Sequence, residues 1–174
     1  EYFCVCISPE KPGDFGMFEN RLAMLRAQIE VTGKNIEQYK DVQHLVYIDD
    51  ATGLYNLRYL NEYLDREISG RLRDGHSFAV LFFDLDQFKK INDTHGHLIG
   101  TKMLNEFGHV LKRHLRRSDS VFRYGGDEFI AVLSPSDRQS ACEIGERIRE
   151  SVDRRVFLRR EGIRNHVTVS IGVA

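Results

Sequence analysis

The sequence predicts an α+β fold: a central, mostly antiparallel sheet flanked by helices and preceded by one long helix. Short apolar runs typical of strands alternate with longer segments of helical periodicity. Two of these runs, residues 121–124 and 128–133, are joined by a Gly-Gly pair that predicts a tight antiparallel hairpin. Residues 18–46 contain one glycine and no proline and repeat apolar side chains in steps of four and three, which predicts the long helix.

The first part of the chain, residues 1–17, is expected to be the tail of an upstream sensory domain. Residues 1–8 have the pattern of a strand and are followed by proline and glycine. The cysteines are Cys4, Cys6 and Cys142, an odd number that forms no disulfide framework. Buried, reduced thiols are therefore expected, which favours a cytoplasmic location.

Residues 18–47 are expected to form a coiled-coil linker helix. An apolar seam with heptad spacing favours a two-stranded coiled coil, and hence a homodimer. A single amphipathic helix packed on its own domain remains an alternative. The polar members Thr32 and Gln43 would lower stability but fix the register. The seam consists of Phe18, Leu22, Leu25, Ile29, Thr32, Ile36, Tyr39, Gln43 and Val46.

The remaining elements follow in order through residues 48–174, after a turn at residues 49–54. Helical spacing predicts helices over residues 57–72, 88–91, 100–115 and 140–152. Apolar runs predict strands over residues 77–83, 121–124, 128–133 and 167–173. Asn92, Asp93 and Gly96 are expected to form a loop between two helices.

The composition excludes several classes of function. The chain of 174 residues carries 25 Lys and Arg against 26 Asp and Glu, a net charge of −1. This balance gives no basic surface for nucleic acid. No apolar stretch approaches the roughly 20 residues that cross a bilayer, so no membrane segment is expected.

Two acidic clusters carry the chemistry. Asp84 and Asp86 follow directly on an apolar strand, and Asp127 and Glu128 follow the Gly-Gly pair, whose type I′ turn would need positive φ at both glycines. Carboxylates converging from two strand ends are the ligands that Mg²⁺ takes together with substrate phosphates. The clusters therefore indicate metal-dependent phosphoryl or nucleotidyl transfer. A pair of solvated acidic turns is the alternative.

Residues 125–129, Gly-Gly-Asp-Glu-Phe, resemble the motif that names the GGDEF family of diguanylate cyclases. The resemblance covers residues 48–174. It includes an opening segment at residues 49–59, a D-x-D-x-F-K core that starts at Asp84, and a late strand at residues 167–172. It implies the nucleotidyl cyclase fold, which is similar to a polymerase palm.

The resemblance also implies roles for single residues. Asp84 and Asp127 would bind Mg²⁺ or Mn²⁺ through carboxylates, with the Leu85 carbonyl as a further ligand. Lys89 would stabilise charge on the triphosphate, and Asp127 or Glu128 would assist the attacking hydroxyl. The residues implied to contact the substrate are Asn92, His97, Thr101, Gly125 and Gly126.

The implied reaction joins two GTP molecules into cyclic di-GMP and releases pyrophosphate, with one nucleotide on each subunit of a homodimer. A degenerate domain that only binds nucleotide is the alternative. A further site for the cyclic product is implied by Arg116 and Asp119, with Arg147 as a weaker member. The alternative for the segment from Arg116 to Asp119 is an ordinary charged helix end.

Two features depart from the family pattern. Thr101 stands where the family usually has an aspartate that resembles a guanine reader. A hydroxyl both donates and accepts, and the hybrid-promiscuous (Hypr) subgroup carries a serine-type change here and makes cyclic GMP-AMP. ATP is therefore left open as a second substrate. The chain also stops at Ala174, where the family continues with a helix bearing Lys or Arg, so the domain is expected to be truncated at its C-terminal end.

Overall fold

The computed structural model describes residues 15–75 and 77–174; at residues 15–18, 20, 35–45, 71 and 74 it describes the backbone alone. It divides the chain into two compact units, Glu1–Leu45 and Val46–Ala174. Helix α1, Phe15–Tyr47, makes up the described part of the first unit and ends in the second. The strand expected at residues 1–8 lies outside the described residues.

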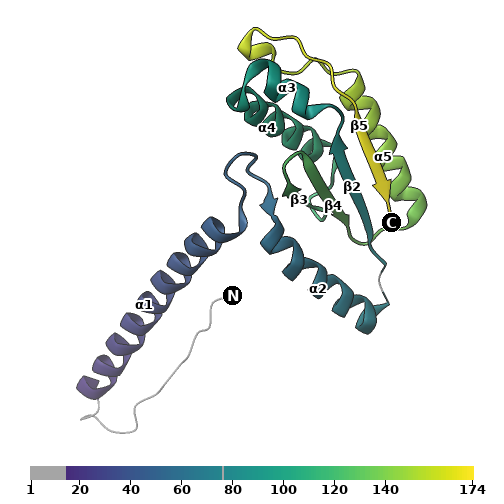
Figure 1. Cartoon of the computed structure of the whole chain (residues 1–174). Helices are drawn as coiled ribbons and strands as arrows, with labels where there is room; N and C mark the ends of the chain where they lie inside the picture. Colours follow the sequence, from purple (N-terminus) through teal and green to yellow (C-terminus); the bar gives the residue numbers. More distant parts are fainter. Residues whose placement is uncertain (1–14, 76) are drawn as a thin grey trace. The chain divides into compact units, whose positions relative to one another are not determined.

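The second unit is built on a five-stranded sheet with the order β1-β3-β4-β2-β5 (Figure 1). β1 pairs in parallel with β3, and the other three pairings are antiparallel. The mostly antiparallel α+β sheet predicted from the sequence is therefore confirmed. The strands are β1 Tyr55–Asn56, β2 Ala79–Leu85, β3 Ser120–Gly125, β4 Glu128–Leu133 and β5 Val169–Val173.

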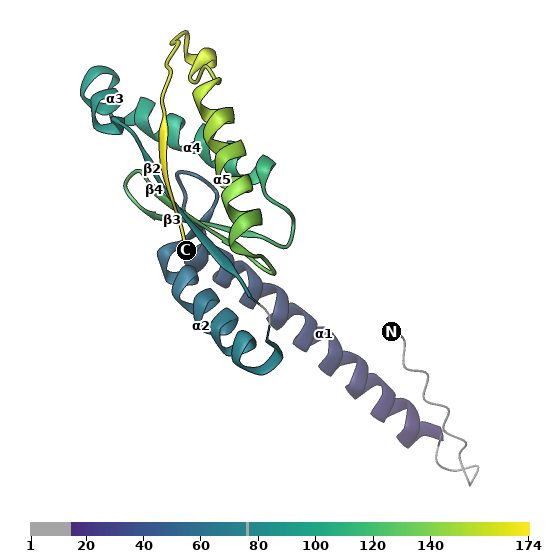
Figure 2. The same ribbon diagram turned by 90° about the vertical axis from the view of Figure 1, so that its right-hand side faces the viewer.

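Helices cover both faces of this sheet (Figure 2). Leu81, Phe83 and Leu85 of β2 are buried with residues of α4 and α5, whereas Val80 and Phe82 pack with the cluster under α2. This alternation follows from the two-residue side-chain period of a strand. The helices are α2 Leu57–Asp74, α3 Phe88–His95, α4 His97–His114 and α5 Arg138–Asp153, and a short 3₁₀ helix spans Arg159–Glu161.

Phenylalanine rings form the centre of the larger core. Phe83, Phe107 and Phe129 are fully buried, and Phe107 meets Phe129 edge to face with ring centroids 4.9 Å apart. Edge-to-face contacts of this kind add to the free energy of burying the rings. The core thereby fixes β2 and β4, the two strands that carry the acidic clusters.

Two local predictions about the helices were wrong. Asn92 and Asp93 lie in α3 rather than in a loop, and α4 begins at His97 rather than near residue 100. Gly96 alone breaks the helix, at φ 83°, and its N–H donates to the Asn92 carbonyl. Because a glycine adopts positive φ without steric cost, one residue is enough to separate the two helices.

The prediction for the hairpin turn was also wrong. The turn residues are Gly126 and Asp127, and neither Gly125 nor Gly126 has positive φ. A register shift between Arg123 and Gly125 puts a bulge in β3 just before the turn. An extra residue on one strand moves the turn along by one position. This bulge brings Asp127 into the turn itself.

Among the described residues, no helix is long and apolar enough to cross a membrane. Cys142 is a free thiol, as expected, but it is exposed on α5 rather than buried. The other cysteines lie outside the described residues.

Candidate functional site

The two acidic clusters meet at one end of the β2–β4 pair. Asp84 of β2 lies directly opposite Glu128 of β4, and Asp127 occupies the turn that precedes β4. The Leu85 N–H points to the Asp127 carbonyl at 3.4 Å. Antiparallel register therefore brings together residues that are more than 40 positions apart in the sequence.

The electrostatics of this site are unfavourable for a bare carboxylate. Burial raises the pKa of the half-buried Asp84 above its ordinary value, and the negative charges of Asp127 and Asp86 raise it further. Within the described residues, no Lys or Arg forms an ion pair with either Asp84 or Asp127. A bound cation would remove this repulsion, so the arrangement fits a positively charged ligand.

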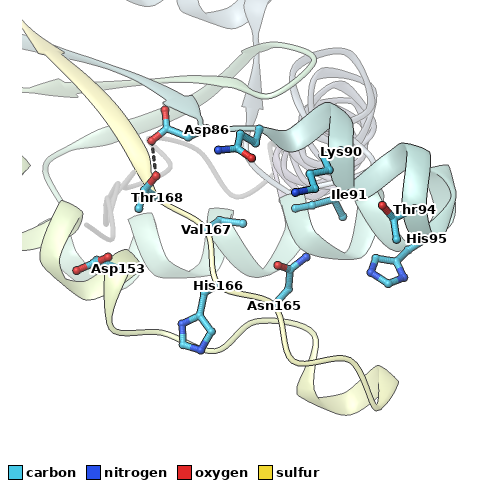
Figure 3. A pocket seen from close by; sticks show the side chains of 11 residues that line it. Asp86, Lys90, Ile91, Thr94, His95, Asp153, Asn165, His166, Val167 and Thr168 are labelled. Atoms are coloured by element: carbon cyan, nitrogen blue, oxygen red, sulfur yellow. Dashed lines mark hydrogen bonds between the residues drawn. The ribbon is translucent and has the colours of Figure 1, made fainter.

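The acids of the cluster are not equivalent. Asp86 accepts hydrogen bonds from the hydroxyls of Thr168 at 2.5 Å (Figure 3) and of Ser170 at 2.8 Å, so both of its oxygens are engaged. The described residues donate no such side-chain hydrogen bond to Asp84. Asp84 is therefore the carboxylate of β2 that is available to a metal.

The donor set fits a hard cation that keeps other ligands. Across residues 15–75 and 77–174, no group of three or more His, Cys, Asp or Glu side chains gathers to hold a metal by itself. Two carboxylates and a backbone carbonyl agree with Mg²⁺, which is usually held by one or two carboxylates and completed by substrate phosphates and water. Asp84, Asp127 and the Leu85 carbonyl would be the protein's share.

Lys89 lies near this end of the sheet, at the second residue of α3. It is exposed, and the described residues offer it no ion pair. The chain reaches α3 from β2 through Gln87, which adopts a left-handed conformation at φ 58°. Such a conformation is uncommon for a residue other than glycine, and it allows α3 to begin within three residues of the strand end.

Asn92, His97 and Thr101 come together at the junction of α3 and α4. The Asn92 side chain lies against Gly100, where a methyl group would overlap its Oδ1 atom and come within 3.2 Å of the Phe88 ring. Only glycine at position 100 permits this close approach. Gly100 therefore positions Asn92, a role that the sequence analysis did not assign.

Thr101 borders a hollow of about 330 Å³ beside α4. Its hydroxyl donates to the His97 carbonyl at 3.0 Å, so the oxygen keeps only acceptor capacity toward a ligand. Two cationic side chains, Lys102 and Arg160, line the same hollow, and Lys102 pairs with Glu161 at 3.2 Å. The other lining residues are Ala51, Leu98, Asn105 and Glu106.

Arg116 and Asp119 line a separate hollow of about 280 Å³ at the other end of the sheet. The Asp119 carboxylate accepts from the Arg116 backbone N–H at 2.8 Å. The Arg116 guanidinium itself forms no ion pair among the described residues. Arg147 is not among the lining residues, and its guanidinium donates to the His114 carbonyl at 2.9 Å.

A further hollow, of about 460 Å³, lies between α3, the end of α5 and residues 165–168 (Figure 3). Lys90 and Ile91 border it from α3. Lys89 and Asn92 do not line it, so it is distinct from the group at the α3–α4 junction.

Sequence reasoning missed the contacts of Asp49 and Arg123. Both residues stand in segments that resemble the family, but neither was given a role. The structure joins them by an ion pair of 3.1 Å across 74 positions. Opposite charges in two separate motifs were the only signal in the sequence, and that signal does not specify pairing.

The fold and the acidic hairpin define a nucleotidyl cyclase type of domain: helices on a mostly antiparallel sheet with carboxylates at adjoining strand ends. The comparison with known families makes this specific. The family described as "Diguanylate cyclase, GGDEF domain" matches residues 46–174, and the chain belongs to the GGDEF family.

Curated relatives agree. The chain is 39% identical over 139 residues to diguanylate cyclase DosC of Escherichia coli, covering 79% of this chain and 30% of that protein. It is 40% identical over 131 residues to response regulator PleD of Caulobacter vibrioides, covering 75% and 29%. The chain thus spans about 30% of the length of these relatives.

Solved structures give the same family. The coiled coil and GGDEF domain of DgcB from Caulobacter crescentus, in complex with c-di-GMP, matches with a TM-score of 0.74 and 28% identity, covering 90% of this chain and 81% of that one. Diguanylate cyclase SiaD from Pseudomonas aeruginosa, in complex with its activator SiaC, matches with a TM-score of 0.71 and 31% identity, covering 91% and 62%.

The Gly100–Asn92 contact leads to a prediction. Gly100→Ala should displace the Asn92 side chain and weaken binding of a GTP analogue about tenfold, the equivalent of one lost hydrogen bond. Titration calorimetry measures this affinity. Gly145→Ala on α5 is the matched control, because its methyl would meet Leu81 at an ordinary 3.5 Å. Equal affinities for the two variants would contradict the role of Gly100.

Proposed function

We propose that this domain condenses two GTP molecules into cyclic di-GMP with release of two pyrophosphates. The observation that carries the proposal is the meeting of Asp84 and Asp127 in a site of unbalanced negative charge. The similarity to diguanylate cyclases over residues 46–174 supports it.

The competing function is a domain that binds nucleotide without turnover. A receptor gains nothing from two close carboxylates that repel each other, because that repulsion only lowers its stability. The presence of Asp84 and Asp127, together with a Lys89 that forms no ion pair within the described part of the chain, favours the enzyme.

The proposed chemistry is a pair of identical displacements. The 3′-hydroxyl oxygen of one GTP bonds to the α-phosphorus of the other, the bond from that phosphorus to the bridging oxygen breaks, and pyrophosphate leaves. The hydroxyl proton passes to Glu128 or to solvent beside it. Lys89 stabilises the charge that develops on the phosphates, and the two displacements close the ring.

A divalent cation is proposed to complete the site. Asp84, Asp127 and the Leu85 carbonyl would hold it, and when bound it would neutralise charge on the phosphate oxygens. Mg²⁺ suits this all-oxygen donor set, and Mn²⁺ suits it as well.

Each domain holds one nucleotide, so two domains must face each other, and α1 is proposed to bring them together. Leu22, Leu25 and Ile29 follow the predicted seam and are exposed in the single chain, Leu25 at 62% and Ile29 at 71%. An apolar seam of this spacing is stabilised by a second helix. The match over 90% of this chain to a solved coiled coil and GGDEF domain supports the dimer.

The base preference is proposed to follow from Thr101. Its hydroxyl hydrogen is used by the His97 carbonyl, so its oxygen can accept from the N–H groups of guanine, as a carboxylate would. The ring acceptor of adenine could be bound only if the hydroxyl turned and gave up that bond, at about 1 kcal/mol. GTP is therefore the preferred substrate and ATP a poorer one, with cyclic GMP-AMP as a minor product.

The cyclic product is proposed to bind at Arg116 and Asp119. Arginine pairs well with phosphate and with the O6 and N7 atoms of guanine. The six residues of β3 separate this site from the turn at Gly126 and Asp127, a length of roughly 20 Å at 3.3 Å per residue. Product bound there would act on the reaction indirectly. Arg147 would have to leave the His114 carbonyl to take part.

The first prediction tests the enzyme. Asp127→Asn should lower kcat for cyclic di-GMP by about 10²–10³-fold, because one charge that stabilises the reacting phosphates is lost. Mass spectrometry of the products from GTP and Mg²⁺ measures the change. Asp65→Asn on the exposed side of α2 is the control and should leave kcat unchanged.

The same variant should keep its fold. A carboxyl whose pKa is raised in the folded state makes folding less favourable above its ordinary pKa of about 4. Asp127→Asn removes part of what raises the pKa of Asp84, so its Tm at pH 7 should equal or exceed that of the parent, with no difference below pH 3. Turnover at the parental rate would refute the metal assignment, and absence of product from the parent itself would favour the receptor.

The second prediction tests the dimer. Replacing Leu25 and Ile29 by Lys puts like charges in the seam, and should give a monomer by light scattering with greatly reduced turnover at low protein concentration. The matched control replaces Met24 and Val31 by Lys, because these side chains are also exposed but lie off the seam. A monomeric variant with full activity would contradict catalysis by paired domains.

The third prediction tests base choice. With equimolar GTP and ATP, the parent should make cyclic di-GMP with a minor share of cyclic GMP-AMP, and Thr101→Asp should suppress that minor product. The expected preference for GTP is about fivefold, since a single hydrogen bond of about 1 kcal/mol separates the two bases. Pure cyclic di-GMP from the parent would show that Thr101 does not relax selectivity.

A further inference from the structure

The side chain of Arg123 binds two separate parts of the domain. Its Nη1 donates to both carboxylate oxygens of Asp49, each at 3.1 Å. Its Nε and Nη2 donate to the Gly126 carbonyl at 3.2 and 2.9 Å. The side chain is only 20% exposed. One guanidinium thus joins the segment after α1 to the turn that carries Asp127.

The contact fixes a particular peptide plane. The Gly126 carbonyl belongs to the same planar unit as the Asp127 N–H, so holding that oxygen orients the peptide before the Asp127 Cα atom. The peptide after it is held by the Leu85 N–H, which points to the Asp127 carbonyl. With both flanking peptides held, the φ and ψ angles of Asp127 are restricted, and so is the direction of its carboxylate.

The turn needs such a restraint. Gly126 is exposed, and nothing lies within 4 Å of the position where its Cβ would be. Glycine also has the widest choice of backbone conformations. The charges of Asp127 and Asp84 repel each other, which favours conformations that separate them. Without a restraint the turn would relax away from Asp84.

Asp49 is a firm anchor for this restraint. Its Oδ1 also accepts from the Thr52 N–H at 2.9 Å and the Thr52 hydroxyl at 2.7 Å. Its backbone N–H donates to the Leu54 carbonyl at 2.8 Å. These hydrogen bonds hold the turn at residues 49–54 together. Arg123 then links this turn to the hairpin.

We propose that Arg123 is a positioning residue, which clamps the Gly126–Asp127 peptide against Asp49 and so holds the Asp127 carboxylate beside Asp84 for metal and substrate. The inference rests on the proposed function for its kinetic consequence, but the clamp itself is independent of turnover. The fork of the guanidinium is essential, because a lysine amine of equal charge cannot make this planar set of four contacts.

Kinetics of three variants test the clamp. Arg123→Met keeps the aliphatic stem, Arg123→Lys keeps the charge, and Asp49→Asn weakens the anchor. Each should lower kcat, the first two by about 10²-fold, as expected for a small misplacement of a reacting group. The Mg²⁺ concentration for half-maximal activity should rise, and KM for GTP should change little. Lysine at full kcat would overturn the proposal, because charge alone would then suffice.

A matched control separates positioning from general loss of stability. Arg155 pairs with Glu106 at 3.5 Å and is similarly half-buried. Arg155→Met removes an ion pair whose residues lie far from the hairpin in the sequence. It should leave kcat and the Mg²⁺ requirement unchanged, even if it lowers Tm. A fall in kcat equal to that of Arg123→Met would overturn the proposal.

Nuclear magnetic resonance tests the clamp without turnover. With ¹³C-carbonyl glycine and ¹⁵N-aspartate, only Gly13–Asp14 and Gly126–Asp127 give a carbonyl-to-nitrogen signal, and the first serves as reference. In Arg123→Met the Gly126 carbonyl should shift upfield, and the Asp127 amide should respond to Mg²⁺ only at higher concentration than in the parent. An unchanged carbonyl shift or an unchanged Mg²⁺ response would overturn the clamp. If the parent makes no product, the proposed function fails, and these two signals still decide the clamp.

Discussion

The repulsion between Asp84 and Asp127 is the constraint on which the rest of this domain depends. Two carboxylates approach each other in a partly buried place, where burial and the charge of Asp127 raise the pKa of Asp84. Backbone pairing of β2 with β4 keeps them there, since six successive residue pairs fix the register from Ala79 to Asp84. Rings buried beneath those strands prevent a slip, because a shift of one residue would turn every core side chain to the wrong face.

The surroundings of this pair assign different tasks to residues of similar chemistry. Asp86 is bound by two hydroxyls and belongs to the framework, whereas Asp84 is left open. Arg123 restrains the hairpin by joining the Gly126 carbonyl to Asp49, which follows shortly after the end of α1. Lys89, by contrast, projects from the start of α3 without an ion pair among the described residues. Paired groups thus support the site, and the unpaired ones are left available to a ligand.

The glycines near the site serve three different physical needs. Gly96 takes a positive φ that separates α3 from α4. Gly100 has an ordinary helical conformation but leaves the space that Asn92 occupies. Gly126 has no positive φ, and no described residue lies close to the position where its Cβ would be. Its carbonyl is the acceptor for Arg123. A glycine in a motif therefore has no single explanation.

The fold class, the family and the identity of the acidic residues could be predicted from the sequence. Strand alternation, helical periodicity and the Gly-Gly-Asp-Glu-Phe motif are local patterns, and local patterns survive in a linear sequence. Some local details were nevertheless wrong. The start of α4 depended on how little chain Gly96 needs to break a helix, and the turn type depended on a bulge in β3 that leaves no mark in the sequence.

The contacts by which residues restrain one another became visible only in the folded chain. The ion pair of Asp49 with Arg123 spans 74 positions, and the contact of Asn92 with Gly100 depends on the angle between two helices. The hydrogen bond that makes the Thr101 oxygen an acceptor depends on its rotamer in α4. These interactions arise from packing in three dimensions, which a sequence pattern does not encode position by position. The chemistry of the site was therefore readable from the sequence, and its positioning was not.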